Sequence, residues 1–221
     1  GITGNQTIDI NGVGTFEANI ASYGAGGAIS MYSDADDGYT GSQTIDINGD
    51  ATFTSNIACD NGGYAGGAIY MRSDADVGYT GYQRIDIGGN ATFEGNEADG
   101  AGGAIFMYSN ASDSTGNQSI YIGGDATFTD NTAGDNGGAI FMFSESGLGD
   151  TGNQSIYIGG DATFTDNITA GYSEGDGNGG AIYMQSDAYY GDTGYQLIDI
   201  EGSATFEGNT AAGYSEGDGN G

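Results

Sequence analysis

One pattern returns at near-regular intervals along this chain, and it limits the folds that the chain can adopt. Phe recurs in the context (A/G)-T-F-x-x-N every 35 to 42 residues. A Q-x-I-x-I segment precedes each copy, and a G-G-A-I-x-M-x-S segment follows the first five. The phenylalanines of this pattern are Phe16, Phe53, Phe93, Phe128, Phe164 and Phe206. A fixed period of this size is typical of solenoids, in which each repeat packs only on its neighbours.

Within each segment the residues alternate with period two, which indicates β-strands. The Gln and both Ile share one face of the first segment, Ala and Phe one face of the second, and the second Gly, Ile, Met and Ser one face of the third. So narrow an apolar stripe is buried only if equivalent strands of successive repeats stack. No window shows a helical period of 3.6, and Gly is scattered throughout. The sequence predicts an all-β chain: a parallel β-helix (β-solenoid) with three short strands per coil and about six coils.

We expect residues 1–221 to form a single array. Its predicted coils cover residues 6–42, 43–82, 83–117, 118–153, 154–195 and, incompletely, 196–221. The sequence ends within a repeat and neither end carries a divergent cap, so we expect an excerpt of a longer array or filament. Uncapped coils would expose strand edges that pair with further repeats or with another subunit.

Two corner positions hold one residue type in every copy. The Gly that follows the first segment predicts either a positive φ or close approach between coils. It occurs at Gly12, Gly49, Gly89, Gly124, Gly160 and Gly202. The Asn three residues after Phe is interpreted as a corner residue whose amides form an inward ladder and satisfy backbone groups. It occurs at Asn19, Asn56, Asn96, Asn131, Asn167 and Asn209.

The charge of the chain excludes several classes of partner. Asp and Glu number 31 against two Arg, His and Lys are absent, and the formal net charge is −29. Such a surface repels nucleic acid and anionic membranes. No apolar run approaches the ~20 residues of a membrane helix, so direct membrane insertion is not expected. The acidity is interpreted either as solubility in a salty or extracellular setting or as a surface that carries cations.

The paired G-G-A-I and F-x-x-N tetrapeptides resemble the repeats of chlamydial polymorphic outer-membrane proteins. G-G-A-I occurs in five copies, and F-x-x-N reads FEAN, FTSN, FEGN, FTDN, FTDN and FEGN. The resemblance covers essentially the whole chain, with both motifs recurring in fixed order. It implies a right-handed β-helix that is displayed on the cell surface and acts as an adhesin.

Catalysis has to be considered because many β-helices process polysaccharide. An acid–base or charge-stabilising site on an acidic sugar needs a basic group beside carboxylates. This chain offers only Arg72 and Arg84, and its Asp positions recur in several coils instead of occurring once. The sequence therefore predicts no catalytic residues and no enzyme.

The third segment predicts two neighbouring aromatic rows on the outside of the solenoid. The residues concerned are Tyr70, Phe106, Phe141 and Tyr183 in one row, and Tyr32, Tyr108 and Phe143 in the other. A contiguous apolar stripe on a solvent face usually marks an interface. Two interpretations stay open: the rows contact another chain or a carbohydrate or protein ligand, or the flanking loops fold over them.

Repeated carboxylates raise the question of bound calcium. Asp9, Asp46 and Asp86 occupy one outward slot in three consecutive coils. Two acidic segments expected to be loops, 33–38 and 73–78, add Asp34, Asp36, Asp74 and Asp76. Carboxylates are hard ligands that suit calcium, although the EF-hand spacing is not met. The sequence predicts no cofactor, and calcium at these carboxylates is the one alternative that it leaves open.

Two further outward patterns allow other roles. Sequons for N-glycosylation occur at Asn5, Asn90, Asn110, Asn117, Asn153 and Asn167. Ranks of T-x-T on the second strand resemble ice-binding proteins, but Glu17, Glu94 and Glu207 interrupt them, and Thr is also a good former of exposed strands.

Taken together, the sequence predicts a non-enzymatic, extracellular or cell-surface structural and adhesive solenoid, such as a stalk or filament unit. The alternatives are an adhesin that binds a ligand or carbohydrate along the aromatic rows, an ice-binding solenoid, and an enzyme that acts on polysaccharide. Self-association is expected end to end and laterally.

Overall fold

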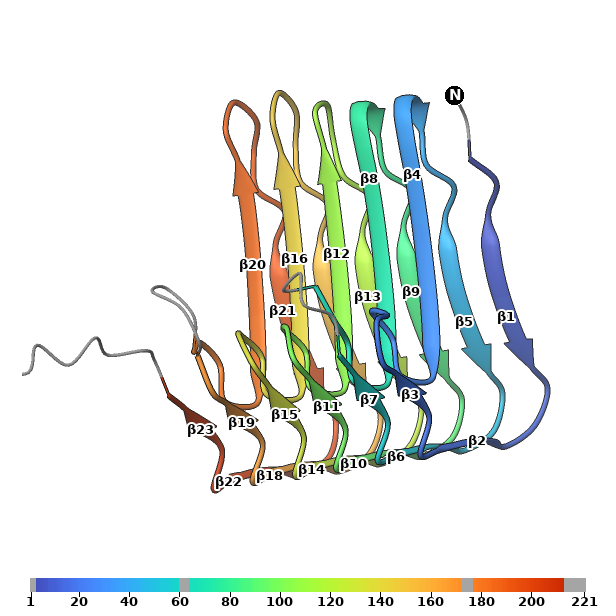
Figure 1. Ribbon diagram of the computed structural model, residues 1–221, viewed down its shortest axis with the longest axis vertical. Helices are drawn as coiled ribbons and strands as arrows, with labels where there is room; N and C mark the ends of the chain where they lie inside the picture. The colour runs from blue at the N-terminus through green and yellow to red at the C-terminus, as the bar shows by residue number, and fades with distance from the viewer. Residues whose placement is uncertain (1–2, 60–63, 172–176, 213–221) are drawn as a thin grey trace, which may run out of the picture.

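The computed structural model describes residues 3–59, 64–171 and 177–212, and these residues form stacked parallel strands without any helix (Figure 1). Followed from the N-terminus in Figure 1, the chain rises along β4 at the front, crosses the top and descends along β5 behind. Each coil lies further to the left, so the path is right-handed. Right-handed crossovers are the rule for parallel strands. The all-β parallel solenoid predicted from the sequence is confirmed.

Four sheets run along the solenoid. The first sheet contains β1 (Gln6–Ile10), β5 (Gln43–Ile47), β9 (Gln83–Ile87), β13 (Gln118–Ile122), β17 (Gln154–Ile158) and β21 (Gln196–Ile200). The second contains β2 (Gly14–Glu17), β6 (Ala51–Thr54), β10 (Ala91–Glu94), β14 (Ala126–Thr129), β18 (Ala162–Thr165) and β22 (Ala204–Glu207).

The remaining two sheets lie on either side of the G-G-A-I corner. The third sheet contains β3 (Ile20–Ala21), β7 (Ile57–Ala58), β11 (Glu97–Ala98), β15 (Thr132–Ala133), β19 (Ile168–Thr169) and β23 (Thr210–Ala211). The fourth contains β4 (Ile29–Tyr39), β8 (Ile69–Tyr79), β12 (Ile105–Ala111), β16 (Ile140–Ser146) and β20 (Ile182–Ala188). Equivalent residues pair throughout, as in Phe93 with Phe128 and Ile105 with Ile140.

The structure corrects two details of the sequence prediction. Each coil has four strands instead of three, because the two residues after the corner Asn form a short strand of their own. The acidic segments at 33–38 and 73–78 are not loops but lie within β4 and β8. Their alternation continues with period two, since Ala35 and Ala75 point inward and are buried. The acidic segments stay in the sheet, despite the low strand preference of Asp, because their backbones pair in register between β4 and β8.

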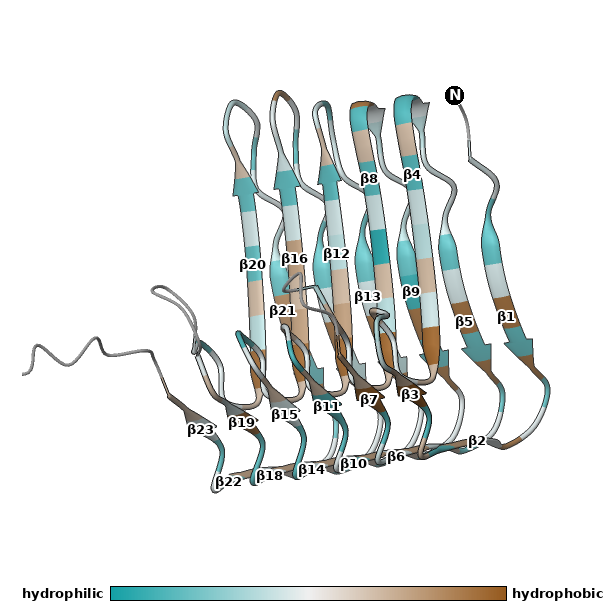
Figure 2. Cartoon of the chain, viewed as in Figure 1, coloured by the Kyte–Doolittle hydropathy of each residue, from teal (hydrophilic) through white to brown (hydrophobic). Residues whose placement is uncertain are grey.

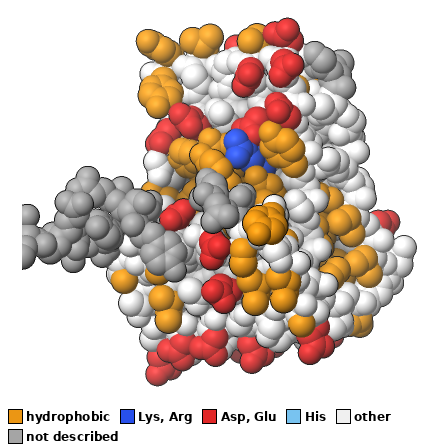
Figure 3. Space-filling model, viewed as in Figure 1, with side chains coloured by type: hydrophobic (Ala, Val, Ile, Leu, Met, Phe, Trp, Pro, Cys, Tyr) orange, Lys and Arg blue, Asp and Glu red, His pale blue; other side chains and the backbone are white. Residues whose placement is uncertain are grey.

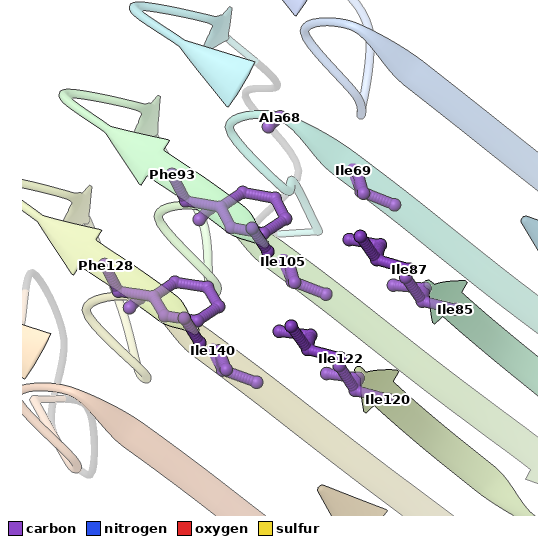
Figure 4. Close-up of a cluster of buried hydrophobic side chains, with 14 of the residues drawn as sticks. Ala68, Ile69, Ile85, Ile87, Phe93, Ile105, Ile120, Ile122, Phe128 and Ile140 are labelled. Atoms are coloured by element: carbon purple, nitrogen blue, oxygen red, sulfur yellow. The ribbon is translucent and has the colours of Figure 1, made fainter. Parts of the chain in front are cut away.

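The hydrophobic core follows the axis of the solenoid as ladders of identical side chains. Neighbouring rings of the Phe ladder stack with centroids 4.5–4.8 Å apart. Figure 4 shows Phe93 and Phe128 facing Ile105 and Ile140 of the fourth sheet, with the Ile pairs of the first sheet beside them. Hydrophobic residues in Figure 2 gather in the lower parts of the strands, toward the second sheet, whereas the upper parts are more polar.

The corner Asn residues form the predicted inward ladder. Asn56, Asn96, Asn131 and Asn167 are fully buried. The side-chain nitrogen of Asn96 donates to Oδ1 of Asn131 at 2.9 Å and to the carbonyl oxygen of Phe53 at 3.0 Å. The backbone N–H of Asn96 donates to the same Oδ1 of Asn131. Each amide thereby satisfies turn backbone groups that burial would otherwise leave without a partner.

The Gln of the first segment forms a second buried ladder. The side-chain nitrogen of Gln118 donates to Oε1 of Gln83 at 3.0 Å and to the carbonyl oxygen of Phe143 at 3.0 Å. This contact ties the first sheet to the fourth across the polar half of the coil. The corner Gly, by contrast, serves close packing: a Cβ on Gly124 would lie 2.3 Å from Oδ1 of Asn90 in the preceding coil. None of the described corner Gly residues has a positive φ, so the close-approach interpretation is the correct one.

Candidate functional site

Two rows of mostly aromatic side chains lie on the outer face of the fourth sheet. Their members pair in register from coil to coil, as Phe106 does with Tyr70 and Phe141, and as Tyr108 does with Arg72 and Phe143. The rings of Phe106 and Phe141 stack with centroids 5.1 Å apart. The rows form a cluster separate from the axial core. Figure 3 shows hydrophobic side chains gathered around a basic group on this face, with acidic groups around them.

The rows are largely covered by the chain itself. Tyr70 is 5% exposed, Phe106 fully buried, Tyr108 5% exposed and Phe141 8% exposed. The cover comes from residues between the third and fourth sheets: Tyr64 packs edge-on to Phe106, with centroids 6.0 Å apart, and Ala101 joins the same cluster. The sequence left two interpretations open, and in the middle coils the correct one is that loops fold over the rows. Tyr32, Phe143 and Tyr183 keep part of their surface in solvent.

An open groove of about 350 Å³ remains between the covering residues and the rows. Phe106, Tyr108, Phe141 and Phe143 form its base, while Tyr64 lies on one side. Its polar groups come from Asp135, Asn136 and Gln185. Binding pockets commonly combine mostly apolar walls with a few polar groups that fix orientation. We call this feature the aromatic groove.

Sequence reasoning found the base of the aromatic groove but missed its walls. Tyr64, Ala101, Asp135 and Asn136 lie in the stretches of variable length just before G-G-A-I. Nothing periodic marks these residues. The available signal was their place in the sequence, one or two residues before G-G-A-I.

The single cation on this face lies between tyrosine rings beside the groove. The guanidinium carbon of Arg72 is 4.4 Å from the ring centre of Tyr64, 5.1 Å from that of Tyr108 and 5.8 Å from that of Tyr32. Its Nε donates to Oδ2 of Asp74 at 2.5 Å. Guanidinium groups bind well over aromatic faces, and a carboxylate strengthens the site. Arg72 is therefore held both by ring faces and by a carboxylate two residues further along β8.

Burial changes the acidity of several groups around Arg72. It raises the pKa of Tyr70 to about 12, although the nearby Arg72 acts in the opposite direction. Burial also raises the pKa of Tyr108, and the charge of Glu145 adds to this effect. The pKa of the Asp74 carboxyl is raised by burial in spite of its hydrogen bond with Arg72. The ion pair of Arg72 with Asp74, whose side chains are 24% and 11% exposed, therefore lies where solvent screens it only in part.

The carboxylates proposed for calcium fall into separate rows. Asp9, Asp46 and Asp86 pair in register on the outside of the first sheet, and Arg84 forms an ion pair with Asp86. Asp34 pairs in register with Asp74, and Asp36 and Asp76 are exposed further along β4 and β8. In residues 3–59, 64–171 and 177–212 no group of three or more His, Cys, Asp or Glu is arranged to hold a metal. Calcium binding stays the open alternative.

The sequon asparagines differ in accessibility. Asn167 is wrong as a glycosylation candidate, because its fully buried amide is bonded to Asn209 and to the carbonyl oxygen of Phe128. Asn5, Asn90 and Asn117 are exposed, and Asn110 and Asn153 are half-buried. The Oδ1 atoms of Asn5 and Asn117 accept hydrogen bonds from backbone N–H groups of the next coil. Glycosylation of these five positions stays a prediction.

The outward positions of the second sheet follow the sequence prediction. Thr52 and Thr54 are half-buried on β6, whereas Glu94 takes the second of these slots on β10 and is exposed. The charged side chains interrupt the ranks of Thr at the positions read from the sequence. As for membranes, none of the described residues form a helix that is long and apolar enough to cross a bilayer.

Comparison with known proteins shows what the repeat is similar to. The family model described as the Chlamydia polymorphic membrane protein repeat matches residues 90–107, 125–142 and 161–185. Neither the curated proteins nor the solved structures that were compared with the chain gave a match. Each matched segment contains one F-x-x-N and one G-G-A-I, and runs from the second sheet through the Asn corner into the outer rows. Three segments of the chain are therefore similar to the Chlamydia polymorphic membrane protein repeat, the family that its paired tetrapeptides resemble.

Proposed function

We propose that this chain is a non-enzymatic, surface-displayed solenoid with a structural and adhesive role. The observation that carries the proposal is the stack itself: one core repeats in register from coil to coil, and the side chains of the outer rows differ among coils. A uniform core gives a stiff rod, because each coil pairs its backbone with both neighbours. Side chains that vary along the rod give it a face that a partner can recognise.

The proposed location is supported by the family comparison. The three segments that match the Chlamydia polymorphic membrane protein repeat favour display at the outer membrane or cell surface. The net charge of −29 suits an exposed, soluble rod. Labelling of intact cells with antibodies against this chain, before and after permeabilisation, tests the location. We expect full labelling of intact cells, and a signal that appears only after permeabilisation would exclude surface display.

Self-association is the structural part of the proposal. Coils that pair in register could extend across a junction between subunits, since a strand edge of one chain fits the equivalent edge of another. Analytical ultracentrifugation over a wide concentration range tests this role, with negative-stain images of the largest species. We expect elongated assemblies that grow with concentration, whereas isolated rods at every concentration would restrict the role to adhesion.

A further inference from the structure

We propose that the aromatic groove binds an arginine side chain of a partner protein. This inference rests on the proposed adhesive role and names the chemistry of the ligand. Its starting point is Arg72, which shows how a guanidinium is held on this face: over tyrosine rings, with a carboxylate two residues further along the same strand. The groove begins beside Arg72, at Tyr64 and Tyr108, and continues over the next coils of the same rows, where rings take the slot of the arginine.

The strand register places the equivalent groups. Arg72 pairs with Tyr108, and Tyr108 pairs with Phe143, so two rings occupy the arginine slot in the next two coils. Asp74 pairs with Asn110, and Asn110 with Glu145, so the carboxylate slot holds an amide and then a carboxylate. Tyr108 and Phe143 both line the groove, and their centroids lie 5.4 Å apart. Glu145 is near enough to Tyr108 for its charge to raise the pKa of that hydroxyl.

The chain itself cannot supply a cation to Glu145. Its two basic side chains are Arg72 and Arg84, and these form ion pairs with Asp74 and Asp86. Asp135 on the wall of the groove adds a further negative charge. The net charge of −29 also attracts basic ligands over long range. A cation that arrives from another molecule therefore finds ring faces and the carboxylate of Asp135 in the groove, with Glu145 two residues after Phe143 on β16.

Guanidinium fits this groove better than ammonium or a sugar ring. Its planar group stacks on aromatic faces and is more weakly hydrated than ammonium, so transfer to a partly dry groove costs less. A sugar would also stack on rings, but it would leave the charge of Glu145 without a partner. The expected order of affinity is arginine, then lysine, then neutral ligands.

The binding experiment uses small probes, so that the overall charge of the chain does not dominate. Nα-acetyl-arginine amide, the matching lysine compound, the uncharged citrulline compound and a neutral oligosaccharide are titrated against the purified chain. Chemical shifts of the tyrosine and phenylalanine rings report binding. We expect the arginine probe to bind with a Kd of about 1 mM and about tenfold more tightly than citrulline. Equal affinity for arginine and citrulline, or tighter binding of the oligosaccharide, would overturn the proposal.

Two variants locate the binding site, and the chain itself shows that both residues fit. Phe143→Gln copies Gln185, which occupies the same slot one coil later, and Glu145→Gln resembles Asn110 one coil earlier. Each variant is expected to weaken arginine binding by about three- to tenfold. Glu94→Gln on the second sheet and Tyr121→Ser on the first are matched controls, which should stay within about twofold of the parent. Equal losses in variants and controls would show general attraction to an acidic chain and no groove site.

Failure of this inference is distinguishable from failure of the proposed function. If the chain labels on intact cells but the arginine probe does not bind, only the ligand assignment is wrong. If arginine binds but the chain is not at the surface, the ligand assignment of the groove is supported and the adhesive role is wrong.

Discussion

The two aromatic stacks of this molecule, one on the axis and one on the outer face, are built differently. On the axis every coil contributes Phe, and adjacent rings are parallel within 4°. On the outer face the corresponding slots hold Ser30, Tyr70, Phe106, Phe141 and Tyr183, and the interplanar angles of the stacked pairs widen from 8° to 20° along the row. The axial stack is closed on all sides by other strands, whereas the outer one is covered by loop residues and keeps a groove.

The difference shows that folding restricts the side chains on the axis, whereas the outer side chains are free to vary and to contact a partner. A side chain on the axis touches its equivalents above and below, so any change of size disturbs three coils at once. A side chain in the outer rows meets loops that vary in length and can adapt. We therefore expect identity among coils on the axis and diversity outside, which is what the repeats show.

The largest expected effect contrasts one ring from each stack. Phe93→Ala removes a fully buried axial ring and should lower the free energy of unfolding by about 3–5 kcal/mol. Phe143→Ala removes a half-buried outer ring and should cost about 1 kcal/mol, since less apolar area is lost and the space stays open to water. Urea denaturation, followed by circular dichroism and tyrosine fluorescence, measures both. Equal losses would mean that the outer rows hold the coils together as strongly as the axis.

A smaller effect at alkaline pH tests how well the loops cover the outer rows. Burial raises the pKa of Tyr70 to about 12, so its ionisation is favoured in the unfolded chain, where a tyrosine titrates near pH 10. The stability that Tyr70 contributes is therefore present below about pH 10 and is lost as the pH rises toward 12. Tyrosinate absorbance should show a group in the folded chain that ionises later than in denaturant.

Tyr70→Phe is the control for this pH effect. The variant keeps the stacked ring and removes the ionisable hydroxyl, so its melting temperature should fall less between pH 9 and pH 11 than that of the parent chain. If both chains lose stability equally over this range, Tyr70 is not shielded by its cover.

The inward-facing residues along the axis could be predicted from the sequence, but much of the arrangement of the outer surface could not. Period-two alternation around Phe93 and Ile105 fixes which residues point inward, and the buried Asn96 ladder follows from one Asn at each corner. The two-residue strand β11 is too short to show any alternation. The cover supplied by Tyr64 comes from a stretch of variable length, whose path depends on tertiary contacts that no local pattern encodes. For the same reason the aromatic groove could not be predicted from the sequence.

The smallest expected effect contrasts the inner Gln ladder with the outer Asp row of the same sheet. Gln amides both donate and accept, so Gln83 and Gln118 stack favourably, whereas Asp46 lies between Asp9 and Asp86 with like charge on both sides. Adjacent like charges destabilise a sheet by about 0.2–1 kcal/mol per pair. Asp46→Asn should therefore raise the melting temperature slightly at low salt, and the gain should shrink as salt screens the charges of the Asp row.

Thermal melts in chelator and in millimolar calcium at constant ionic strength then test how the parent chain tolerates the Asp row. If calcium bridges these carboxylates, as the sequence allows, calcium stabilises the parent more than sodium chloride does and has less effect on the Asp46→Asn variant. Equal gains from both salts would leave screening by solvent ions as the full explanation.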